Sequence, residues 1–137
     1  TTIEGIAFHN AGLGLVHGMS EPVGGRFHTS HGITNAILLP EVLEFNLIAR
    51  PDRYVRLAEA MGIQTNGLTK REAAGAFVEA VRELSTDIGI PAGLSDLGAE
   101  KEAIPELVDE AYDHVNSRNN ARQYTHEDLK EIYHRAF

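Results

Sequence analysis

Apolar and polar residues are distributed along this chain in the pattern of α-helices. In most segments the apolar residues recur every three or four positions, so that they fall on one face of a helix. No convincing pair of strands can be found, and there is no internal repeat or low-complexity tract. The pattern therefore predicts an all-α fold of about six helices.

The first predicted helix covers residues 3–19. Two stripes at helical spacing run through it, one ending in a histidine and one made of small residues: Ile6, Asn10, Leu13 and His17, and Ala7, Ala11, Gly14 and Gly18. Each glycine inside a helix costs about 1 kcal/mol relative to alanine. Gly12 and Gly14 therefore indicate that another helix or a ligand approaches closely. The Pro-Val-Gly-Gly run at 22–25 predicts the break after this helix.

The second predicted helix runs from residue 33 to about residue 49. Thr29 or Ser30 can cap it, which places His31 in its first turn. Apolar residues cover most of its circumference, as is typical of a helix that is buried on nearly all sides. Pro40 lies inside this segment and should bend the helix, because proline cannot donate a backbone hydrogen bond.

Capping and breaking residues predict four further helices. They run from Pro51 to Gly62, from Thr69 to Gly89, from Pro105 to Val115 and from Thr125 to Ala136. Thr69 and Glu72 have the spacing of a capping box, in which two side chains satisfy free backbone N–H groups. Residues 90–103 are expected to form a long connection with room for one helical turn, and 116–120 a polar loop.

The size and charge of the chain narrow the classes of partner. Its 137 residues suit one domain, 1–137, with a single core. With 12 Lys and Arg against 20 Asp and Glu, the formal net charge of −8 repels phosphate backbones and anionic lipids. The apolar runs are far shorter than the roughly 20 residues that span a bilayer. We therefore expect a soluble protein with neither nucleic acid nor a membrane as its partner.

The absence of cysteine limits the chemistry that the chain can perform. Disulfides, thiolate zinc sites and cysteine nucleophiles are excluded, so any metal must be bound by histidine or carboxylate side chains. The same absence fits a reducing, cytoplasmic location. The chain opens with Thr-Thr-Ile-Glu rather than methionine and moves directly into apolar sequence, from which we expect a fragment of a larger protein.

The histidines offer the most specific candidate chemistry. His17 shares a stripe with apolar residues and His31 follows a helix cap, so the glycine-rich segment between them can bring the two imidazoles together. Convergent histidines suggest a metal, although a core histidine satisfied by hydrogen bonds is the other interpretation. His28 could join the pair, and Glu21 is the nearest third ligand unless it is a solvated carboxylate. The remaining candidates are expected to be solvated: His114, His126 and His134.

Two histidines do not complete a catalytic metal site. Catalytic zinc or iron usually takes three or more protein ligands and keeps a position open for water or substrate. The Gly12-Leu-Gly14 run lacks the preceding strand and third glycine of a dinucleotide-binding motif. Ser20 and Ser30 have no recognisable oxyanion hole. We therefore expect no catalytic residues beyond the metal ligands.

Three blocks of sequence resemble the second signature of the iron-containing (group III) alcohol dehydrogenases. They are Ala11-Gly-Leu-Gly-Leu-Val-His17-Gly-Met, Ser30-His31-Gly32 and Asn35-Ala-Ile-Leu-Leu-Pro40. The resemblance continues over essentially the whole chain. It implies the C-terminal all-α domain of an enzyme whose N-terminal nucleotide-binding domain is missing here.

The resemblance also implies an activity and a set of site residues. Members transfer hydride between a primary alcohol or aldehyde and NAD or NADP, with Fe²⁺ or sometimes Zn²⁺ held by an Asp and three His. Two of those histidines map onto His17 and His31, and the other two ligands lie upstream of this chain. Phe8 matches an aromatic residue that lines the nicotinamide and substrate cleft, which makes it a cofactor-binding candidate.

Three departures from the family pattern bear on the substrate side of the site. Glu21 stands where close relatives often have a second histidine near the reacting centre, which favours a substrate-proximal role over a ligand role. Asn116 replaces a residue that is cysteine in some members, and Ala121 interrupts their Asn-Pro-Arg turn. We expect the whole enzyme to be a homo-oligomer and the fragment alone to be inactive. The alternative is a non-catalytic helical module that binds metal or supports oligomerisation.

Overall fold

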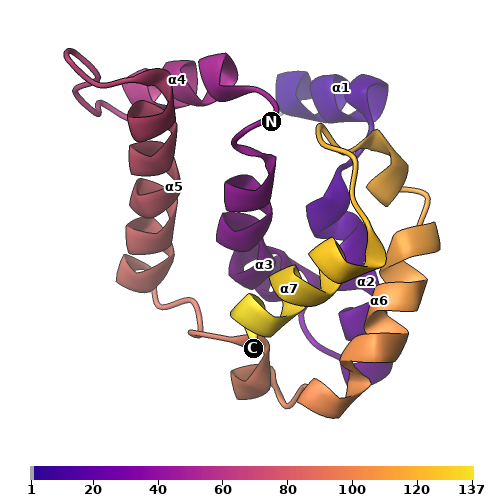
Figure 1. The fold of residues 1–137 in the computed structure, drawn as a ribbon. Coiled ribbons are helices and arrows are strands. Elements are labelled where there is room, and N and C mark those ends of the chain that lie inside the picture. The colour runs from indigo at the N-terminus through magenta and orange to yellow at the C-terminus, as the bar shows by residue number, and fades with distance from the viewer. Residues whose placement is uncertain (1) are drawn as a thin grey trace.

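The computed structural model describes residues 2–137, apart from four side chains of the first helix: Glu4, Ala7, Phe8 and Asn10. All regular secondary structure among the described residues is helical, which confirms the all-α prediction (Figure 1). The α-helices are α1 (Thr2–Ala11), α2 (Leu15–Phe27), α3 (His31–Asn46), α4 (Pro51–Ala60), α5 (Lys70–Asp87), α6 (Ile104–Asp113) and α7 (His126–Ala136). Three short 3-10 helices lie between them, η1 (Leu94–Leu97), η2 (Lys101–Ala103) and η3 (Ser117–Asn119).

Helix α3 stands between two groups of helices. Figure 1 shows α5 on one side of α3, with α2 and α6 on the other and α7 crossing in front. The larger core joins α2, α3, α6 and α7 and contains the fully buried Met19, Leu38, Leu107, Leu129 and Tyr133. A smaller core packs α4 against α5 around Ala58, Ala74 and Val78. Burial of these apolar side chains, rather than helix propensity, supplies most of the helical stability.

The first predicted helix is wrong in both its extent and its end. Gly12 adopts φ +75°, a left-handed conformation that glycine tolerates, and α1 ends there instead of continuing to residue 19. The 22–25 segment does not break the chain either, because Pro22 lies inside α2. Pro22 and Val23 are buried, and this packing outweighs their poor helix propensity. Helix α2 instead ends at Phe27 and is followed by His28, whose φ is 54°.

The expected close approach is confirmed at Gly12 but not at Gly14, where an added Cβ would have no atom nearer than 4.0 Å. A Cβ on Gly18 would overlap the hydroxyl of Ser117, and one on Gly12 would overlap the side chain of Asn119. Both neighbours belong to η3, which therefore packs directly on the first turn of α2 and the turn before it. Ser117 is fully buried, and its hydroxyl donates to the Ala111 carbonyl at 2.7 Å. The missing side chains thus let η3 reach the α2 backbone.

The predicted caps of α5 and α7 are confirmed, whereas the predicted cap of α3 is wrong, because Ser30 precedes that helix without making a side-chain capping hydrogen bond. Thr69 and Glu72 form the predicted capping box, and Thr125 forms a second one with Asp128. Helix α3 continues through Pro40 to Asn46, so the bend at Pro40 stays a prediction. The 90–103 connection contains η1 and η2 rather than one turn. In the part of the chain that the structure describes, no helix is long and apolar enough to cross a membrane.

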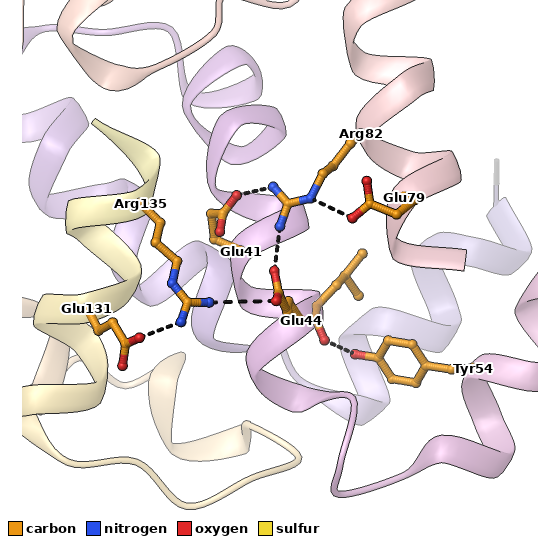
Figure 2. Close-up of polar contacts among 8 residues, drawn as sticks. Glu41, Glu44, Tyr54, Glu79, Arg82, Glu131 and Arg135 are labelled. Carbon is orange, nitrogen blue, oxygen red and sulfur yellow. Dashed lines mark hydrogen bonds and ion pairs between the residues drawn. The ribbon is translucent and has the colours of Figure 1, made fainter. Parts of the chain in front are cut away.

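Ion pairs connect α5, α3 and α7 (Figure 2). Arg82 of α5 contacts Glu41 of α3, and it also lies 2.6 Å from Glu44 and 3.4 Å from Glu79. Arg135 of α7 lies 3.8 Å from the other oxygen of Glu44. The hydrogen bond with Glu41 raises the pKa of Arg82. Because Glu41 is only 7 % exposed, this arginine compensates a carboxylate that would be costly to bury alone.

Candidate metal centre

The structure brings His17 and His31 together. His17 lies in the first turn of α2 and His31 is the first residue of α3, and these two helices pack against each other. Their ring centroids are 5.2 Å apart, with the ring planes tilted by 55°. His17 is half-buried and His31 is exposed. The apolar stripe that pointed His17 inward does not exist, because Ile6 belongs to α1 and is 61 % exposed.

Asn35 occupies the space between the two imidazoles. It follows His31 by one helical turn, so both side chains lie on the same face of α3. Its Nδ2 is 3.0 Å from Nε2 of His31 and 3.4 Å from Nε2 of His17. The two Nε2 atoms therefore face a common point. Asn35 Oδ1 is buried and has no hydrogen-bond partner among the described residues.

Electrostatics favour the neutral form of His17, which is the form that binds a metal. Burial lowers the pKa of His17, and the neighbouring His31 lowers it further. Glu21 acts in the opposite direction and raises it. A half-buried imidazole with a lowered pKa keeps its Nε2 lone pair at a lower pH than a solvated one would.

His17 borders a mostly apolar hollow of about 480 Å³. His17 and Asn35 contribute its polar groups, while Leu13, Val16 and Leu39 contribute apolar surface. Gly12, Gly14 and Gly32 leave the backbone accessible on the same wall. Such a wall can exclude water beside a polar group, a common feature of small-molecule sites.

Glu21 lies one helical turn beyond His17 and is held by two distant residues. Its Oε1 accepts a hydrogen bond from Asn116 Nδ2 at 3.0 Å, and its Oε2 is 3.0 Å from His114 Nε2. These partners follow α6 in the chain, so the contacts join α2 to the turn between α6 and η3. The prediction that His114 is solvated is wrong, since its side chain is only 23 % exposed and pairs with Glu21. No local signal in the sequence could have found this pair.

The other candidate residues lie outside this cluster. His28 is exposed at the end of α2, and His134 is exposed on α7. His126 is half-exposed but stacks on Tyr112 with ring centroids 3.8 Å apart, so it is not fully solvated as expected. Phe8 belongs to α1, but its side chain lies outside those that the structure describes.

The donor set fits part of a divalent metal site. Two imidazole nitrogens at one point are ligands that suit zinc or ferrous iron. Among the described residues there is no group of three histidine or carboxylate side chains that could hold a metal ion. The described residues therefore provide two convergent donors and an apolar wall, which is fewer ligands than a catalytic metal site needs.

Comparison with known proteins places the chain in a family. The profile of the Fe-containing alcohol dehydrogenase family, C-terminal, matches residues 1–137. The chain is 45 % identical to lactaldehyde reductase of Escherichia coli (strain K12) over 135 residues, which cover 98 % of this chain and 35 % of that protein. It is 41 % identical to 1,3-propanediol dehydrogenase of Citrobacter freundii, with the same coverage of both proteins.

Solved structures show the same relation. A crystal structure of 1,3-propanediol oxidoreductase superimposes with a TM-score of 0.95 at 40 % identity, covering 97 % of this chain and 35 % of that one. Alcohol dehydrogenase from Oenococcus oeni superimposes with a TM-score of 0.93 at 41 % identity, with the same coverage. The chain thus spans about a third of the length of the relatives that it matches. We conclude that it belongs to the Fe-containing alcohol dehydrogenase family and corresponds to the C-terminal domain of these enzymes.

Proposed function

We propose that this chain is the metal-binding C-terminal domain of an enzyme that transfers hydride between a primary alcohol or aldehyde and NAD or NADP. The observation that carries the proposal is the convergence of the His17 and His31 Nε2 atoms on one point beside an apolar wall. Relatives named for alcohol and aldehyde chemistry support it, among them an NAD-dependent methanol dehydrogenase of Bacillus methanolicus that is 38 % identical.

His17 and His31 would each provide Nε2 as a ligand to Fe²⁺, or to Zn²⁺ in its place. Such an ion, when bound, supplies Lewis-acid polarisation of the alcohol or aldehyde oxygen. Two imidazoles fall short of the three or more protein ligands of a catalytic site. The remaining ligands, and the nucleotide-binding site, would come from an N-terminal domain. His17 and His31 would then be half of a site between two domains.

Two further residues would shape the substrate and cofactor side. Glu21 lies on the same face of α2 as His17, and His114 and Asn116 hold its carboxylate in place. We infer that it is substrate-proximal, where its negative charge would influence which alcohols are accepted. Phe8 would border the nicotinamide. A cytoplasmic location and a homo-oligomeric enzyme belong to the same proposal.

Metal titration of the chain tests the assignment of the two histidines. Zn²⁺, and Fe²⁺ under anaerobic conditions, would be titrated into the wild type, His17→Ala and His31→Ala and followed by calorimetry. His134→Ala is the matched control, because His134 is an exposed histidine of α7. We expect wild-type binding that both site variants lose and the control retains. Binding that is indifferent to both site variants would favour the non-catalytic helical module instead.

An activity assay tests the division of the site between two domains. The purified chain, supplied with metal, NAD or NADP and a primary alcohol, should show no dehydrogenase activity, because it contributes only two of the ligands. Turnover by the chain alone would contradict the proposal. Nicotinamide reduction is followed by its absorbance, with lactaldehyde reductase of Escherichia coli as a positive control.

A further inference from the structure

The contacts of Asn35 constrain which nitrogen of each imidazole carries the hydrogen. An amide nitrogen has two N–H donors and no acceptor, whereas a neutral imidazole has one donor and one acceptor nitrogen. Asn35 Nδ2 lies within hydrogen-bond distance of Nε2 on both His17 and His31. If Nδ2 donates one hydrogen to each ring, both Nε2 atoms are acceptors and both rings carry their hydrogen on Nδ1.

Burial favours this orientation of the Asn35 amide. Its Oδ1 lies buried without a hydrogen-bond partner among the described residues. In the reverse orientation the NH₂ group would take that position and leave two donors unpaired instead of one acceptor. Because each unpaired buried polar group costs free energy, the orientation with Nδ2 between the rings is the less costly one.

We propose that Asn35 is a positioning residue that holds His17 and His31 in the Nδ1–H tautomer, with both Nε2 lone pairs directed at one point. This is the tautomer that binds a metal through Nε2. The tautomer assignment stands on the contacts of Asn35 alone, and its consequence for metal binding rests on the proposed function.

The proposal predicts that metal affinity rises when the Asn35 amide is removed. A metal bound through Nε2 would use the same lone pairs that accept from Asn35, so the two interactions exclude each other. Removal of the amide therefore destabilises the metal-free chain and leaves the loaded chain unaffected. Zn²⁺ affinity should rise by about two- to tenfold for each of the two hydrogen bonds that the amide no longer makes. Loss of an ordinary supporting residue would weaken binding instead.

Nitrogen NMR of the chain tests the tautomers without any metal. Long-range ¹H–¹⁵N spectra of ¹⁵N-histidine-labelled chain would be recorded at about pH 8, where neutral imidazoles predominate. The wild type should show the Nδ1–H pattern for His17 and His31. Asn35→Ala and the nearly isosteric Asn35→Leu should both populate Nε2–H. The control is Asn46→Ala, which removes another asparagine of α3. Asn46 forms hydrogen bonds with Asn120 at 2.8 Å, so its loss should leave both tautomers unchanged.

Calorimetry with Zn²⁺ on the same variants completes the test. Asn35→Ala and Asn35→Leu should bind more tightly than the wild type, and Asn46→Ala should bind equally. The proposal is overturned by Nε2–H rings in the wild type, by tautomers that neither Asn35 variant changes, or by weaker binding in both. If the wild type shows Nδ1–H tautomers but His17→Ala and His31→Ala bind Zn²⁺ as well as the wild type, the proposed function is refuted and the role of Asn35 stands. Unchanged tautomers together with lost binding in those variants would refute only the role of Asn35.

Discussion

The hydroxyl of Tyr133 connects the last helix to the helix that carries the metal candidates. Tyr133 of α7 is fully buried, and its hydroxyl donates to the Met19 carbonyl at 2.7 Å. Met19 lies between His17 and Glu21 on α2, so this hydrogen bond fixes the backbone that presents both side chains. Burial raises the pKa of Tyr133, which keeps the donor hydrogen in place at all ordinary pH values.

Tyr133→Phe removes this one hydrogen bond and leaves the packing of the ring intact. A typical net hydrogen bond contributes about 0.5–1.5 kcal/mol, and a fully buried one should lie near the upper end of that range. The entropy of unfolding per residue converts this loss into a melting temperature about 3–5 °C lower for a chain of this length. Circular dichroism during heating measures the shift.

The matched control is Tyr124→Phe, whose hydroxyl makes an exposed 3.4 Å contact with the Tyr112 carbonyl. This variant should melt within about 1 °C of the wild type, because a solvated hydrogen bond exchanges readily with water. Equal melting temperatures for Tyr133→Phe and the wild type would refute the reasoning. A fall of more than about 10 °C would refute it too, since that exceeds what one hydrogen bond can contribute.

Two further predictions concern α2. The pKa of His17 should lie below 6.5 in an NMR titration of the wild type, and a value of 6.5 or above would contradict the burial of its ring. The His31→Ala variant should raise the pKa of His17, and the Glu21→Gln variant should lower it further. Because the unfolded chain then binds the proton more readily, His17 should reduce folding stability as the pH falls through 6.5. In the Gly18→Ala variant the added Cβ would overlap Ser117, so the free energy of unfolding measured by urea denaturation should fall by about 1–3 kcal/mol. In the Gly25→Ala variant the added Cβ meets open space, so the free energy of unfolding should rise by about 0.5–1 kcal/mol. Equal stability of these two variants would rule out the close packing of η3.

Signals that act over three or four residues were predictable from the sequence. The Thr69 and Thr125 caps, and the proline starts of α4 and α6, depend on contacts within one turn, so the spacing of residue types is enough to locate them. The same holds for the all-α class, because helical periodicity is itself a local property.

Helix breaks in the glycine-rich segment were not predictable in this way. Pro22 favours a break by its own propensity, yet it stays helical because it and Val23 are buried in the core. Gly12 looks like one more interior glycine, yet it adopts a left-handed conformation where η3 packs closely. The outcome at Gly12 depends on Asn119, about 100 positions away, and the outcome at Pro22 depends on the packing of α2 against other helices, and no local pattern contains either.

The candidate metal site likewise has features that depend on residue type and features that depend on the packing of distant helices. Residue types alone limit the candidate metal ligands to histidines and carboxylates, because the chain has no cysteine, and the glycine-rich segment between them makes His17 and His31 the candidate pair. The meeting of their Nε2 atoms at Asn35, and the contacts of Glu21 with His114 and Asn116, arise from the packing of the helices. Residue type sets the chemistry of a ligand, whereas the packing of α2 against α3 and α6 sets where that ligand points.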